Sequence, residues 1–208
     1  MSQESDEPGE RAALGDWAAA MSEGGRYGRR SKRDQSLVEL ETVREFSASV
    51  QAETGFGLTE IRCGQDPPDC VALYRGRTVS IELVELVDPD VRHAVIQARR
   101  HGKAFPAPER FQWGEDGTRE RIGCALDKKQ VLYQDRKPPI CVDVLLIHVD
   151  NAWFSAAQLT AWIPGGTFSP RPNMRSAYLM LGYDGGEHLP IHNLYGAPLP
   201  QPATIVFR

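Results

Sequence analysis

The fold of this chain is decided by two neighbouring stretches, Asp66-Pro67-Pro68-Asp69-Cys70 and Val79-Ser80-Ile81-Glu82-Leu83-Val84-Glu85-Leu86. Between them, Tyr74-Arg75-Gly76-Arg77 has the composition of a tight hairpin turn. Strand side chains alternate between the faces of a sheet, so Glu82 is a charged side chain within an otherwise apolar strand. A buried carboxylate is costly unless it is paired or binds a cation. We therefore expect Asp69 and Glu82, brought together by the hairpin, to share one hard cation such as Mg²⁺.

This arrangement resembles the PD-(D/E)XK nuclease superfamily. The pattern of that superfamily is an Asp, often after Pro, then a hairpin, then an acid-x-Lys on the next strand. Pro68-Asp69 and Glu82-Leu83-Val84 occupy those positions, and the resemblance covers roughly residues 37 to 150. A closer resemblance is to uncharacterised bacterial proteins with a strand ending in Ile-Glu-Val-Thr-Glu-Leu, here Ile81 to Leu86. The sequence departs from the pattern at Val84, which stands in place of the Lys and can neither donate a proton nor stabilise an anion.

The expected cofactor is Mg²⁺ or Mn²⁺, held by the carboxylates of Asp69 and Glu82, with the backbone carbonyl of Leu83 as a third ligand. A metal there would lower the pKa of a bound water and neutralise a scissile phosphate. Glu85 has a weaker claim, because alternation places it on the opposite face unless a bulge intervenes. The structural alternative is a turn or capping aspartate at position 69 and a salt-bridged glutamate at position 82.

A substitute for the missing Lys is expected from elsewhere in the chain. Lys129 is the best candidate, because it falls on the apolar face of a helix predicted over Thr118 to Gln134, and Lys128 is the second. The similar bacterial proteins also carry lysines in this helix. The alternative for Lys129 is a side chain that covers apolar surface with its stem and keeps its ammonium in water.

The resemblance also implies two supporting residues. Nuclease-like families often have a Gln on the helix after the acid-x-Lys strand, and Gln97 is in that place. They often place an acid on the first helix near the metal, for which Glu39 fits better by spacing than Glu45. The alternatives are a surface glutamine and capping or surface glutamates.

Periodicity places the remaining elements. A helix is predicted from Leu37 to about Glu53, with Ser36 and Glu39 as a capping box and its core face on residues 43, 46 and 50. Further helices are predicted over residues 91–101, 118–134 and 153–162, and strands over 58–63, 70–74, 78–87, 140–149, 175–183 and 203–207. We expect an α/β fold, with α+β as the alternative: a single restriction-endonuclease-like domain, residues 35–208, with a central mixed sheet flanked by helices. Residues 1–34 are predicted to form a disordered or loosely attached arm.

Composition limits the classes of partner. The chain has 208 residues, is 41% hydrophobic and 25% charged, and carries a net charge of −4. It has no apolar run of membrane-spanning length and no apolar signal core near its start, which predicts a cytoplasmic protein without a membrane partner. Its four cysteines lack zinc spacing. A DNA or RNA partner would therefore have to bind a local basic patch.

Two functions fit these observations, and a third remains open. The first is metal-dependent hydrolysis of phosphodiester bonds in DNA or RNA. The second is a catalytically inactive nuclease fold that serves as a nucleic-acid-binding or protein-interaction module, which Val84 supports. The third is a structural protein that binds neither metal nor nucleic acid, which requires that Asp69 and Glu82 do not converge.

Overall fold

The computed structural model describes residues 32–86, 113–149, 155–182 and 189–196, together with positions 93, 97, 101 and 199. In this part of the chain, helices α2 (Lys32–Thr54), α4 (Glu115–Gln134) and α5 (Ala156–Trp162) accompany a six-stranded sheet. Its strands are β1 (Thr59–Cys63), β2 (Cys70–Tyr74), β3 (Arg77–Glu85), β4 (Val142–Val149), β5 (Met174–Leu181) and β6 (Ile191–Tyr195). The predicted α/β architecture around one mixed sheet is confirmed. None of the described helices is long and apolar enough to cross a membrane.

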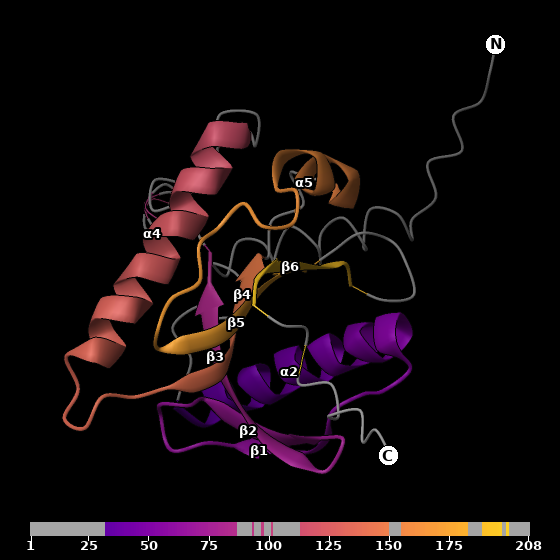
Figure 1. Cartoon of the computed structure of the whole chain (residues 1–208), viewed down its shortest axis with the longest axis vertical. Coiled ribbons are helices and arrows are strands. Elements are labelled where there is room, and N and C mark those ends of the chain that lie inside the picture. Colours follow the sequence, from indigo (N-terminus) through magenta and orange to yellow (C-terminus); the bar gives the residue numbers. More distant parts are fainter. Residues whose placement is uncertain are drawn as a thin grey trace, which may run out of the picture.

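The strands lie in the sheet in the order in which they occur in the chain (Figure 1). Strands β1, β2 and β3 are antiparallel, β4 and β5 continue parallel to β3, and β6 returns antiparallel. The β2–β3 turn has positive φ at Arg75 (50°) and Gly76 (76°), the signature of a type I′ hairpin. The predicted hairpin is confirmed, and it sets the register that pairs Cys70 with Ile81.

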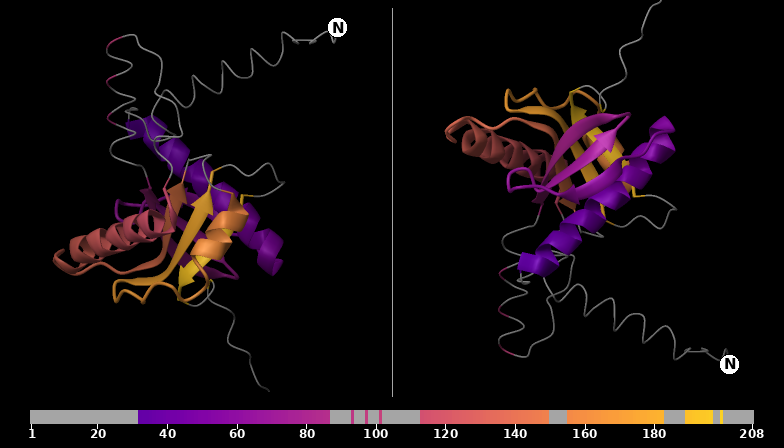
Figure 2. Two further views of the ribbon diagram at one scale, coloured as in Figure 1. Left: turned by 90° about the horizontal axis from the view of Figure 1, so that it is seen from above. Right: turned by 90° about the horizontal axis from the view of Figure 1, so that it is seen from below.

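Each face of the sheet has its own hydrophobic core, and the helices divide between the faces (Figure 2). Helix α2 buries Val43, Phe46 and Val50 on one face, at the predicted spacings of three and four. Helices α4 and α5 cover the other face, where Leu126 and Leu159 are fully buried. Because β3 alternates, its Ile81 and Leu83 belong to the α2 core, while Glu82 between them turns toward α4.

A polar clamp fixes the parallel pairing of β3 with β4. Oδ2 of Asp143 accepts hydrogen bonds from the backbone N–H of Ser80 at 2.9 Å and from its hydroxyl at 2.7 Å. Nη1 of Arg175 lies 3.1 Å from Oδ1 of the same carboxylate. The resulting register sets Glu82 opposite Leu145, in the middle of the face that α4 covers.

Some predicted boundaries were wrong. Helix α2 begins at Lys32, so Ser36 lies inside the helix and does not cap it, and residues 32–34 belong to α2. The side chain of Glu39 instead accepts a hydrogen bond from Nε2 of Gln35 at 2.9 Å. Strand β6 was not predicted. The strand predicted over 203–207, the arm up to residue 31 and most of the helix predicted over 91–101 lie outside the described residues.

Candidate functional site

A tight loop delivers Asp69 to the start of β2. The backbone N–H of Gly64 donates to the carbonyl of Asp69 at 2.7 Å, and that of Asp66 donates to the carbonyl of Pro68 at 3.1 Å. A Cβ on Gly64 would lie 1.9 Å from the carbonyl oxygen of Pro68, which is far inside van der Waals contact. Only glycine therefore fits here, and the loop fixes the position of Asp69.

The carboxylate of Asp69 reaches across the hairpin to β3. Its Oδ2 accepts a hydrogen bond of 2.8 Å from the backbone N–H of Leu83. Burial and then the negative charge of Glu82 raise the pKa of Asp69, the Leu83 hydrogen bond lowers it, and the net result is a pKa of about 7. Asp69 and Glu82 thus lie close enough for the negative charge of Glu82 to raise the pKa of Asp69.

Glu82 is a charged residue in the interior of the protein. It is only 3% exposed, and its Oε1 lies 2.5 Å from Nζ of Lys129 on α4. Its other oxygen, Oε2, is buried and has no hydrogen-bond partner among the described residues. A carboxylate in such surroundings requires a positive partner, and one of its two oxygens is still available for a second one.

Lys129 occupies the place that the sequence predicted for it, on the side of α4 that faces the sheet. One turn further along the helix, the ring of Tyr133 lies with its centroid 5.8 Å from Nζ of Lys129. Burial raises the pKa of the Tyr133 hydroxyl, and the nearby charge of Glu82 raises it further. In the sequence, the spacing of four residues between Lys129 and Tyr133 is the signal that places both side chains on one face of the helix.

Glu39 reaches the same centre from α2. The pKa of Glu39 is raised, mainly by burial and less by the negative charges of Asp66 and Glu82. The hydrogen bond from Gln35 acts in the opposite direction and lowers it. The predicted acid of the first helix is therefore within electrostatic range of the carboxylate pair.

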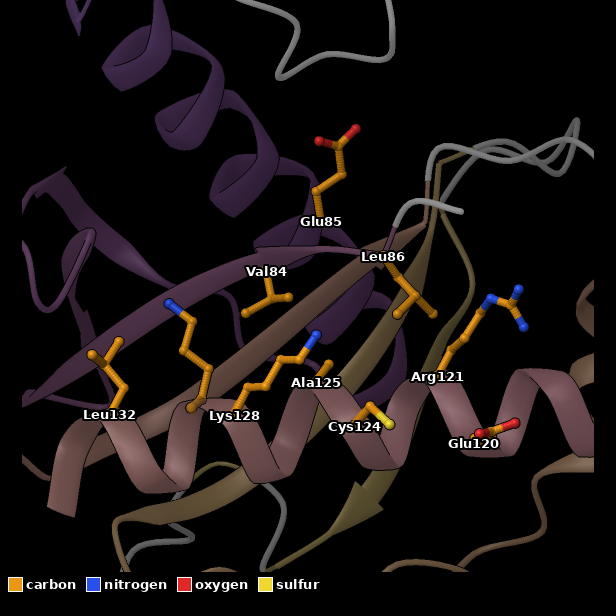
Figure 3. Close-up of a pocket in the computed structure, with 10 residues that line it drawn as sticks. Val84, Glu85, Leu86, Glu120, Arg121, Cys124, Ala125, Lys128 and Leu132 are labelled. Carbon is orange, nitrogen blue, oxygen red and sulfur yellow. The ribbon is translucent and has the colours of Figure 1, made fainter. Parts of the chain in front are cut away.

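The remaining candidates differ in position. Nε2 of Gln97 lies 3.5 Å from Nε2 of His93, and the structure describes no contact between Gln97 and the carboxylates. Glu85 points away from α4, as alternation along β3 predicted (Figure 3). Lys128 lies beside Lys129 in sequence but lines a pocket next to the site rather than contacting Glu82.

The site offers a hard divalent cation two carboxylates, so water would have to supply most of the remaining ligands. Within residues 32–86, 113–149, 155–182 and 189–196, no group of three or more His, Cys, Asp and Glu side chains could hold a metal ion. Mg²⁺, however, is commonly held by one or two carboxylates and keeps several waters. Asp69, and Glu82 with an Oε2 that has no hydrogen-bond partner among the described residues, are the two carboxylates that fit that requirement.

A pocket of about 570 Å³ adjoins the site between β3 and α4 (Figure 3). Val84 and Leu86 line it from the strand, and Arg121, Lys128 and Lys129 line it from the helix. Lys129 therefore belongs both to this pocket and to the ion pair with Glu82.

No family model, curated protein or solved structure matches this chain. Its function has to be inferred from the contacts of its own residues.

Proposed function

We propose that this chain hydrolyses phosphodiester bonds of nucleic acid with Mg²⁺ or Mn²⁺, and that Lys129 replaces the Lys missing at Val84. The supporting observation is the 2.5 Å contact between Nζ of Lys129 and Oε1 of Glu82. This contact puts an ammonium from helix α4 beside Glu82, the buried acid of the PD-(D/E)XK-like strand β3. With Lys129 in this role, the proposed site has two carboxylates and a lysine.

Asp69 and Glu82, with the carbonyl of Leu83, would hold the cation. When bound, a divalent cation would supply positive charge to the scissile phosphate and lower the pKa of a water. The raised pKa of Asp69 supports this assignment, because it arises in part from negative charges crowded together, a repulsion that a cation relieves.

The side chains themselves would position the substrate and the attacking water. The ammonium of Lys129 is a point charge that can bind a phosphate oxygen next to the carboxylates. Glu39 is half-buried at the edge of the same acidic group, where it can accept a hydrogen bond from a water and orient it. We assign Gln97 only an auxiliary role in contacting the scissile phosphate.

A second function is favoured by the same ion pair. Lys129 neutralises Glu82 without any metal, and Val84 leaves the strand itself without a lysine. If the pair persists when nucleic acid is bound, the domain is an inactive nuclease fold that binds nucleic acid or protein. Cleavage distinguishes the two functions.

The test is an incubation of labelled single- and double-stranded DNA and RNA with Mg²⁺ or Mn²⁺ and with EDTA. Wild type is compared with Glu82→Gln and with Glu53→Gln, a matched loss of one charge at an exposed position of α2 outside the pocket. Metal-dependent cleavage by wild type and Glu53→Gln that is at least 100-fold slower in Glu82→Gln would support the nuclease. Equal rates in all three proteins, or binding without cleavage, would refute it.

A further inference from the structure

The pocket between β3 and α4 joins an apolar surface to a basic one. Val84, Leu86, Ala125 and Leu132 supply apolar atoms, and Leu132 is 45% exposed, so part of this apolar surface faces solvent. Arg121, Ala125, Lys128 and Leu132 are spaced by three or four residues, which puts them in one stripe along α4. An anionic ligand with a flat apolar part matches such a stripe.

The two acidic side chains that line the pocket, Glu85 and Glu120, do not point toward Lys128. Glu85 points from β3 away from α4, and Glu120 extends along the helix away from the lysines (Figure 3). Lys128 is exposed and makes no ion pair within the described part of the chain. Its ammonium is therefore available to a phosphate, while its stem covers the apolar atoms beneath it.

The size of the pocket selects the form of nucleic acid. A volume of about 570 Å³ lies in the range of pockets that enclose one small organic ligand, such as a nucleoside. A duplex keeps its bases stacked, and extruding one costs a few kcal/mol. Bases of a single strand are already unpaired, so they enter an apolar pocket at lower cost while basic side chains bind the backbone.

From these observations we propose that the pocket binds one base of a single-stranded nucleic acid and that Lys128 binds an adjacent phosphate. This inference rests on the proposed function for its class of ligand, and it specifies the substrate as single-stranded. Lys129 links the two regions, because it lines the pocket and contacts Glu82. A base in the pocket thus places a neighbouring phosphate beside the two carboxylates.

The test measures binding without cleavage. Fluorescence anisotropy in EDTA would compare labelled 12-nucleotide single strands of DNA and of RNA, a DNA strand of equal length without bases, and a DNA duplex. We expect either single strand to bind at least 10-fold more tightly than the duplex and the abasic strand, with affinity falling as salt increases. The DNA and RNA arms show which sugar is preferred.

Two variants localise the binding, and one controls for charge. Lys128→Glu removes the proposed phosphate contact, and Cys124→Leu narrows the pocket from an exposed lining position without adding an aromatic ring on which a base could stack. Each should weaken single-strand binding at least 5-fold. Arg136→Glu makes the same change of charge outside the pocket and should have little effect; thermal melting verifies that all three variants fold.

Equal affinity for the single strand, duplex and abasic strand would overturn the inference, as would equal effects of Lys128→Glu and Arg136→Glu. Failure of the proposed function looks different. Single-strand binding that depends on Lys128, without cleavage in Mg²⁺ or Mn²⁺, would keep the pocket and refute the nuclease. Cleavage that depends on Glu82 but is insensitive to Lys128 and to the pocket would keep the nuclease and refute the pocket.

Discussion

Nζ of Lys129 lies 2.5 Å from Oε1 of Glu82, although the two residues are 47 positions apart in the sequence. The contact joins the middle of strand β3 to helix α4 and neutralises a carboxylate that is 3% exposed. The ammonium of Lys129 thus supplies, from α4, a positive charge beside Glu82 that Val84 on β3 does not provide. The stability of the fold and the proposed chemistry therefore depend on the same pair.

Lys129→Met should destabilise the protein strongly, because Glu82 stays buried without its positive partner. We expect a loss of roughly 3 kcal/mol in the free energy of unfolding, measured by urea denaturation in EDTA. Lys128→Met, one position away on the exposed side, should change it by less than about 0.5 kcal/mol. The double variant Glu82→Gln/Lys129→Met should recover most of the loss, and if it does not, the ion pair is not the cause.

Mg²⁺ provides a second measurement on the same variant. If Asp69 and Glu82 bind the cation, millimolar Mg²⁺ should stabilise Lys129→Met more than wild type, because it replaces the missing ammonium. Asp69→Asn/Lys129→Met should lose this stabilisation. The same response to Mg²⁺ in all three proteins would exclude the carboxylate pair as the binding site.

The sequence was sufficient to predict the hairpin and the pair of acids, because both follow from local rules. Strand alternation and the Arg75-Gly76 turn brought Asp69 level with Glu82, and an apolar strand around Glu82 demanded a cationic partner. Lys129 could be selected as the substitute for the Lys missing at Val84, because its spacing to Ile122 and Leu126 placed it on the buried side of α4, whereas its ion pair with Glu82 is seen only in the structure.

Other features were beyond prediction because they depend on tertiary contacts. Helix α2 extends back to Lys32 past the expected cap at Ser36, and nothing in the local pattern marks that start. Strand β6 is short, with only Leu194 and Tyr195 buried, and it exists because it pairs with β5. The pocket beside the site depends on the spacing between β3 and α4, which a sequence does not contain.

The pH dependence of stability should reveal the charge state of Asp69. Its pKa in the folded protein is raised by burial, and then by Glu82, to about 7, whereas an unfolded Asp titrates near 4. The folded state thus binds the proton more tightly, so this contribution to stability is present at low pH and is lost as the pH rises to about 7. In EDTA, the free energy of unfolding of wild type should fall relative to Asp69→Asn between about pH 4 and 7. A difference that is constant with pH would contradict the raised pKa.

Gly64→Ala should disrupt the loop that positions Asp69. The added Cβ would meet the carbonyl oxygen of Pro68 at 1.9 Å, so the backbone has to shift and the hydrogen bond from Leu83 is strained. We expect a loss of about 1–3 kcal/mol, as for other overpacked sites. Gly123→Ala is the matched control and should raise the free energy of unfolding. The added Cβ meets nothing within 4 Å, and alanine is more favourable than glycine inside a helix. Equal urea midpoints for the two variants would show that the loop is adaptable.

Moving the lysine back to the strand is the sharpest test of the site. Residues two apart on a strand project from the same face about 7 Å apart, so a lysine at position 84 can reach Glu82. Val84 is half-buried beside the pocket, which lets the ammonium of Val84→Lys approach the carboxylate while its stem stays on apolar surface. Val84→Lys/Lys129→Met conserves net charge and should regain at least half of the stability lost in Lys129→Met. If Lys129 serves the proposed hydrolysis, this variant should also regain metal-dependent cleavage, whereas regained stability without cleavage would show that the ion pair is structural and favour the inactive nuclease fold.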